Sequence, residues 1–171
     1  MCSKSIMSLL FVLAVSSCGG DGISGPAREG TGNLSASGAV STSGEGLAIF
    51  QSVSVSGMSL FQIAVQPAAP SSGSVWQLQI VRYAERPAVG TYQLTELSSG
   101  SQDPTANFYY TVSGTMEMFT ATSGELVITS SSTTAVRGTF TFTAESTTNS
   151  ARTVTVQGAF AAQCPPGTNC Q

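Results

Sequence analysis

The segments VRGTFTFTA at residues 136–144 and TVTVQGAF at residues 153–160 decide the fold of this chain. In both segments small or apolar residues alternate with mostly polar ones, so the two kinds of side chain point to opposite faces of an extended backbone. The first set comprises Val136, Gly138, Phe140, Phe142 and Ala144, and the second comprises Val154, Val156, Gly158 and Phe160. The polar stretch 145–151 between them predicts an antiparallel hairpin with one apolar face and one threonine-rich face.

Upstream of this hairpin, apolar segments separated by turn residues predict further strands. The segments are 47–50, 60–65, 75–82, 90–97, 107–112, 115–121 and 125–129. Within 75–82, Trp76, Leu78 and Ile80 share one face and two glutamines take the other, which is typical of a half-buried strand. Residues 46–53 also fit one or two helical turns, but their glycines and β-branched residues favour a strand.

Glycine-containing turns separate several of these strands. Ser113-Gly114 predicts a tight hairpin, and Thr122-Ser123-Gly124 predicts a second turn before residues 125–129. Many short strands with no convincing helix between them are typical of antiparallel sandwiches and barrels. The sequence therefore predicts an all-β fold, a single antiparallel β-sandwich or small barrel of about nine or ten strands.

The N-terminus has the layout of an export signal. Lys4 precedes the apolar stretch 6–15, which a single serine interrupts. As a helix this stretch would span about 15 Å, half of a bilayer core of roughly 30 Å, so it is too short for a stable membrane span. It closes with Val15-Ser16-Ser17-Cys18, which resembles the lipobox of bacterial lipoproteins.

The lipobox resemblance implies that residues 1–17 are removed and that Cys18 becomes the lipidated first residue, with palmitate among its acyl chains. Such chains would anchor the protein almost irreversibly, because each buried methylene contributes about 0.8 kcal/mol. In this family an aspartate after the cysteine often marks retention at the inner membrane, so Gly19 points to the outer membrane. The alternative is an ordinary signal peptide in which Cys18 is incidental.

The rest of the chain divides by composition. Residues 18–32 carry the lipidated cysteine and a flexible glycine-rich tether, which would average roughly 20 Å end to end. Residues 33–163 form the predicted β-domain, of a size that suits one hydrophobic core. Residues 164–171 form a C-terminal tail.

Three segments of the predicted domain resemble the C-terminal part of bacterial envelope lipoproteins that carry an uncharacterised β-rich domain. They are GELVIT at 124–129, VRGTFTFTA at 136–144 and VTVQGAF at 154–160, with GTYQL at 90–94 as an upstream extension. The resemblance implies an exported β-domain and brings no known activity and no site residues.

Two cysteines remain downstream of the lipobox. Cys164 and Cys170 flank a short loop, and an even pair in an exported protein predicts a disulfide that fastens the tail. A loop of this size contributes about 2 kcal/mol at most in the chain-entropy treatment. A redox pair and a pair of metal thiolates are the alternatives, although this spacing without histidine lacks further ligands for zinc.

The composition excludes several classes of function. Without residues 1–17 the chain has no lysine and carries five arginines against nine acidic residues, which argues against nucleic acid as a partner. The chain contains no histidine, which excludes hydrolases of the Ser-His-Asp type and removes the usual transition-metal ligand. The sequence therefore predicts no catalytic residue, no metal site and no cofactor.

One catalytic arrangement stays open, a pair of carboxylates of the kind that glycoside hydrolysis uses. Glu117 and Glu125 are close enough in sequence to form such a pair. The favoured interpretation is that both are ordinary solvent-facing residues of a hairpin. Two close carboxylates at the bottom of a deep cleft would favour the enzyme.

The segment RYAERP at 82–87 is one candidate for ligand binding. It gathers three charges in a chain with few, and the guanidinium groups of Arg82 and Arg86 suit carboxylate or phosphate ligands. The favoured interpretation is a local ion pair between either arginine and Glu85 at the exit of a strand.

The segment NFYY at 107–110 is a second candidate, because neighbouring aromatic residues on a strand point to opposite faces. An outward Tyr109 with Trp76 nearby would form a platform for a sugar or an apolar ligand. The favoured alternative places Trp76, Phe108 and Tyr110 in the core.

Two faces stay undecided from the sequence. Met116 and Met118 share one face of their strand and Glu117 and Phe119 share the other, and either face could be the core. The threonines of the last hairpin form an array that is interpreted as solvated surface, with contact to a carbohydrate or another sheet as the alternatives. These residues are Thr139, Thr141, Thr143, Thr153 and Thr155.

Together these features predict a lipid-anchored, non-catalytic protein of the cell envelope that serves as a binding or interaction module. Its partners would be the membrane, through the lipid on Cys18, and an envelope protein or glycan. One alternative is a structural envelope component without a small ligand. Another is a carrier of small apolar ligands, if the sheet closes into a barrel with an apolar pocket.

Overall fold

The computed structural model describes residues 27–55, 57–68, 74–96, 101–168 and 170. The predicted signal peptide and Cys18 lie outside these residues, as does most of the predicted tether. Nine strands make up the described part. They are β1 (Thr31–Gly38), β2 (Thr42–Val55), β3 (Met58–Pro67), β4 (Ser74–Arg82), β5 (Gly90–Gln93), β6 (Thr105–Val112), β7 (Thr115–Ser131), β8 (Ala135–Ser146) and β9 (Thr153–Gln163).

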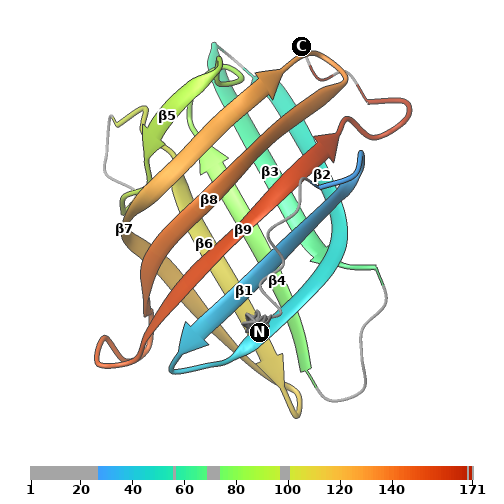
Figure 1. The fold of residues 1–171 in the computed structure, drawn as a ribbon. Coiled ribbons are helices and arrows are strands. Elements are labelled where there is room, and N and C mark those ends of the chain that lie inside the picture. The colour runs from blue at the N-terminus through green and yellow to red at the C-terminus, as the bar shows by residue number, and fades with distance from the viewer. Residues whose placement is uncertain (1–26, 56, 69–73, 97–100, 169, 171) are drawn as a thin grey trace, which may run out of the picture.

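Eight of the strands close into an antiparallel β-barrel (Figure 1), which confirms the predicted fold class and selects the barrel over the sandwich. Around the ring the order is β1-β2-β3-β4-β6-β7-β8-β9, and pairing of β9 with β1 closes it. The short β5 pairs with the second half of β7, and β6 pairs with the first half along the same edge. Among the described residues no helix is long and apolar enough to cross a membrane.

The interior of the barrel is filled by the apolar half of each alternating strand. Ring centroids lie 6.0 Å apart for Phe50 and Phe61, and 6.2 Å apart for Phe108 and Phe119. The largest fully buried side chains are Phe50, Phe61, Phe108, Phe119, Phe142, Phe160, Leu34, Ile63, Leu78, Ile80, Leu94 and Leu126. Side chains that contact one another at such distances form a packed core, which is the main source of stability in a domain of this size.

The last hairpin adopts the predicted alternation, with Val136 paired to Ala162 and Ala144 paired to Val154. Two glycines on its inner face have a specific role. Gly138 lies opposite Phe160 and Gly158 lies opposite Phe140, so each phenylalanine ring covers the glycine of the other strand.

The hairpin predicted at Ser113-Gly114 is also confirmed. Ser113 and Gly114 have φ angles of 50° and 80° and connect β6 to β7 as a two-residue turn. Positive φ at both positions is the requirement of the hairpin turn that matches the twist of the flanking strands. Residues 46–53, for which helical turns were the alternative, lie within β2.

The predicted turn at Thr122-Ser123-Gly124 is wrong. These residues lie inside β7, which continues from Thr115 to Ser131, and the register against β8 shifts between Ala121 and Ser123. Gly124, with φ 151°, follows this β-bulge. A bulge of this kind bends a strand without reversing the chain. Here it shifts the inward positions by one residue, from Phe119 and Ala121 to Leu126 and Ile128.

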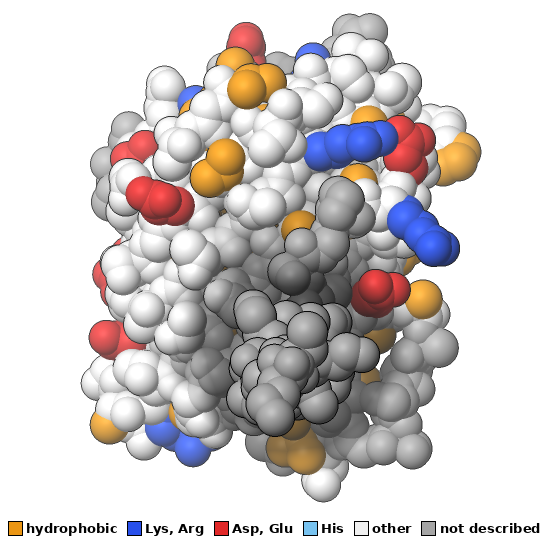
Figure 2. Space-filling model, viewed as in Figure 1, with side chains coloured by type: hydrophobic (Ala, Val, Ile, Leu, Met, Phe, Trp, Pro, Cys, Tyr) orange, Lys and Arg blue, Asp and Glu red, His pale blue; other side chains and the backbone are white. Residues whose placement is uncertain are grey.

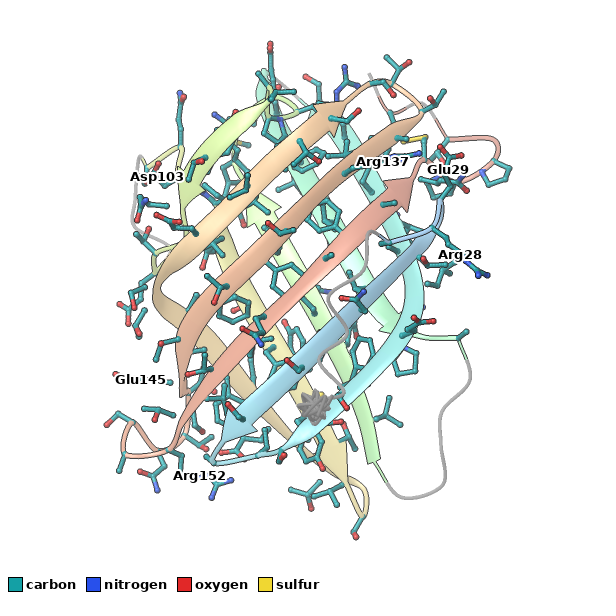
Figure 3. All side chains as sticks on the ribbon, in the orientation of Figure 1. Arg28, Glu29, Asp103, Arg137, Glu145 and Arg152 are labelled. Atoms are coloured by element: carbon teal, nitrogen blue, oxygen red, sulfur yellow. A yellow bond between two sulfur atoms is a disulfide. The ribbon has the colours of Figure 1, made fainter. Side chains whose placement is uncertain are left out.

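The face of β7 that the sequence left undecided is settled by the barrel. Phe119 is buried and Met116 is exposed, so the glutamate and phenylalanine face inward. Glu117 lies near the end of the barrel and meets Arg152, whose Nε and Nη2 donate to its two carboxylate oxygens at 2.9 and 3.0 Å. Arg152 lies at the lower end in Figure 3, opposite the end that carries Arg137 and Glu29.

The ion pair of Arg152 with Glu117 predicts a dependence of stability on pH. Hydrogen bonds from Arg152 lower the pKa of Glu117, so the stabilisation is complete above the unfolded-state pKa of about 4.3 and is lost as the pH falls through the lower folded-state pKa. We expect Arg152→Gln to be slightly less stable than the wild type at pH 7, and this difference to shrink as the pH falls below about 4.3. Urea unfolding across this range measures both, with the exposed Arg28→Gln as the control for charge. A difference in stability that does not shrink between pH 7 and pH 3 would contradict the prediction.

Candidate functional site

A groove of about 670 Å³ opens at the end of the barrel where β3 begins and β4 ends. One wall is the start of β3, and the other is the segment that connects β4 to β5. The lining residues are Gly57, Met58, Ser59, Arg82, Tyr83, Ala84, Glu85, Arg86, Ala88, Tyr92 and Gln102. A volume of this size accommodates a small organic ligand.

Arg82 is the best-fixed cation of the groove. Its Nε donates to the backbone oxygen of Gln102 at 2.9 Å, and its Nη1 donates to the backbone oxygen of Glu85 at 2.7 Å. The guanidinium carbon lies 5.3 Å from the centroid of the Tyr92 ring, within the range of a cation–π contact. The hydroxyl of Tyr92 donates to the backbone oxygen of Ala88 at 2.9 Å, which fixes the ring in turn.

Arg86 is fixed from the C-terminal tail. Its Nη1 donates to the backbone oxygen of Cys170 at 2.9 Å. Cys170 is buried in the core and is joined to Cys164 by a disulfide, which confirms the predicted pairing. The disulfide loop therefore holds one end of the groove.

The local ion pair proposed from the sequence does not form. Glu85 makes no salt bridge to Arg82 or Arg86, and Arg82 contacts the backbone oxygen of Glu85 in place of its carboxylate. The salt bridges among the described residues join Arg137 to Glu29 and Arg152 to Glu117, both outside the groove (Figure 3). Neither groove arginine therefore has a carboxylate salt-bridge partner among the described residues.

The structure separates the other two predicted binding residues from the groove. Trp76 is 5% exposed and belongs to the core, where its indole packs over Gly44. Tyr109 does point outward on β6, and its hydroxyl lies 3.4 Å from Oε1 of Gln79. Trp76 and Tyr109 therefore lie on opposite faces of the barrel wall. The predicted ligand platform formed by these two rings is wrong.

Glu117 and Glu125 do not form a carboxylate pair. They lie eight positions apart on one continuous strand, a separation of roughly 26 Å in extended backbone. Glu117 is engaged by Arg152, while Glu125 is exposed and contacts Gln93.

The threonine array lies on the outer wall of β8 and β9, where all five of its hydroxyl-bearing side chains are exposed. Thr143 pairs with Thr155 and Thr141 pairs with Gln157 across the two strands. Figure 2 views this side of the barrel, and the part of it that is not covered by grey atoms is mostly uncharged surface with few charged side chains. The exposure of the threonines agrees with solvated surface, the favoured interpretation, and leaves contact with a carbohydrate or another sheet open.

Six of the lining residues lie outside the segment 82–87 that the sequence singled out, and three of them have large side chains. Met58, Tyr92 and Gln102 come from separate segments and meet at Arg82 or across from it. Their sequence neighbourhoods carry no charged or aromatic cluster that would have identified them, because the groove is made by the closing of the barrel.

A family model described as "Domain of unknown function (DUF6252)" matches residues 74–163, just over half of the chain. The match begins with β4 and ends with β9. Neither the curated proteins nor the solved structures contain a match to this chain.

Proposed function

The chain belongs to the family described as "Domain of unknown function (DUF6252)", and from its own residues we propose that it is a lipid-anchored, non-catalytic binding module of the bacterial cell envelope. The groove beside Arg82 carries this proposal, because it combines a ligand-sized hollow with cations that no neighbouring carboxylate neutralises.

The lipobox supports the anchored location. Val15-Ser16-Ser17-Cys18 and the preceding apolar stretch fit a lipoprotein signal, and Gly19 favours the outer membrane. The disulfide between Cys164 and Cys170 is compatible with an oxidising compartment outside the cytoplasm.

The packed interior favours binding on the outside of the barrel over carriage within it. A carrier requires a lumen that its ligand can enter. Here the inward positions are taken by phenylalanines, leucines and isoleucines that contact one another. A groove at the end of the barrel can bind a ligand without displacing this core.

Two features support a non-catalytic role. The chain has no histidine, the commonest general base. The carboxylates with the best spacing in sequence, Glu117 and Glu125, are far apart on β7.

Replacement of Cys18 tests the anchor. We expect the full-length wild-type protein to sediment with the outer membrane, and Cys18→Ser to lose the lipid and leave the membrane fraction, because the remaining contacts are those of a barrel with a polar wall. Fractionation of cells on a density gradient and the mass of the N-terminal peptide measure this. Cys2→Ser is the matched control, since it changes a cysteine within the segment that is removed. Sedimentation of Cys18→Ser with the wild type would contradict the proposal.

A further inference from the structure

We propose that the groove lined by Arg82 and Arg86 binds an organic oxyanion, a carboxylate or phosphate attached to an aromatic or apolar body. The inference rests on the proposed function in taking the barrel as a binding module, and it adds the site and the chemical class of ligand. The charge, the rigidity and the apolar lining of the groove each point to this class.

Charge is the first argument. Arg82 and Arg86 both line the groove, and their described contacts are to backbone carbonyls and to an aromatic ring. A carbonyl orients a guanidinium group without neutralising it. Each guanidinium carries five N–H donors, and these contacts engage two of them in Arg82 and one in Arg86. The remaining donors suit an oxyanion, which accepts paired hydrogen bonds from such a fork.

Rigidity is the second argument. The groups that hold Arg82 come from the β4–β5 segment and from Gln102, and the group that holds Arg86 comes from Cys170, 84 positions away. The disulfide ties Cys170 to the end of β9. Cations that are positioned before the ligand arrives lose little side-chain entropy on binding, which favours affinity.

The apolar and aromatic side chains within this mostly polar lining are the third argument and indicate more than a bare anion. Met58 is 72% exposed and Tyr83 is 53% exposed, and both line the groove with the ring of Tyr92. Large exposed apolar side chains next to cations are matched by a ligand that carries an anionic head on an apolar body.

The negative charge of Glu85 predicts a change in anion affinity of opposite sign to that of the arginine variants. Glu85 is exposed, is one of the residues that line the groove, and has no salt-bridge partner among the described residues. It therefore repels an incoming anion, and its neutralisation should strengthen binding. A variant that merely loosened the fold would not raise affinity.

Titration calorimetry of the full-length lipidated protein in a non-ionic detergent tests the proposal. The probes are phenyl phosphate, benzoate, inorganic phosphate and the neutral phenyl β-glucoside. We expect saturable binding of the two aromatic anions, at least tenfold weaker binding of inorganic phosphate, and none of the glucoside. Higher salt should weaken the binding, because the groove is open to solvent.

Four single variants locate the site. Arg86→Gln should weaken phenyl phosphate at least tenfold, Glu85→Gln should tighten it, and Arg28→Gln, which removes the same charge from an exposed residue outside the groove, should change it less than twofold. Arg82→Lys should weaken binding too, because an ammonium group cannot replace the fork. An equal effect of Arg28→Gln and Arg86→Gln would overturn the site.

The outcomes for the two proposals differ. If the glucoside binds and the anions do not, the class of ligand assigned to the groove is wrong while a binding module remains supported. If no probe binds a protein that melts cooperatively, the groove assignment fails, and the anchoring proposal is judged separately by the Cys18→Ser variant.

Discussion

Gly158→Ala is expected to unfold the protein or to cost more than about 3 kcal/mol of stability, the upper part of the range for overpacked interiors. A Cβ at this position would lie 2.1 Å from the backbone oxygen of Asn33 and 2.7 Å from Cζ of Phe140. The oxygen belongs to β1, which pairs with β9 at the closure of the barrel. No side-chain rotation relieves a clash with backbone, so the seam between the first and last strands would have to open.

Circular dichroism and urea unfolding of soluble protein measure this effect, and two variants serve as controls. Gln157→Ala changes the exposed neighbour on the same strand and should cost less than about 1 kcal/mol. Gly57→Ala tests conformational strain alone, since its φ is 82° and nothing lies within 4 Å of the added Cβ, and it should cost about 1–2 kcal/mol. A Gly158→Ala protein as stable as Gly57→Ala would show that the seam can relax.

The same glycines show how far the sequence determines the fold. The alternation around Gly138 and Gly158 predicts the hairpin and its inner face, because period two needs only local information. Why glycine is required at these two positions cannot be deduced from the sequence of one strand. It appears when the register places Phe160 over Gly138 and Phe140 over Gly158, which makes small residues necessary there.

β7 illustrates the opposite case. Serine and glycine at positions 123 and 124 have the composition of a turn, and local chemistry predicted one. The chain continues because β8 offers a partner to both halves of the strand, and the bulge satisfies the change of register. In β7, pairing with β8 over its whole length thus overrides the local preference of these two residues for a turn.

The groove could be predicted only in part for a related reason. Arg82 and Arg86 were identifiable as a local concentration of charge. Their partners, the oxygens of Gln102 and Cys170, lie 20 and 84 positions along the chain, and carbonyl oxygens have no signature in a sequence. Trp76 was a candidate binding residue, but it lies in the core, the favoured interpretation, and alternation alone gives two faces without saying which one the barrel encloses.

Phe108→Ala is expected to cost about 3–5 kcal/mol, the usual range for removing a phenylalanine from a packed core. The side chain is 0% exposed, and its ring centroid lies 6.2 Å from Phe119 and 6.4 Å from Tyr110. Tyr109→Ala, one position along on the outer face, is the matched control and should cost about 1 kcal/mol. Urea unfolding of the two variants gives the difference. A hollow barrel would lose far less on truncation of Phe108, since the cavity would already exist, so near-equal costs would contradict the packed core and restore the carrier as the better interpretation.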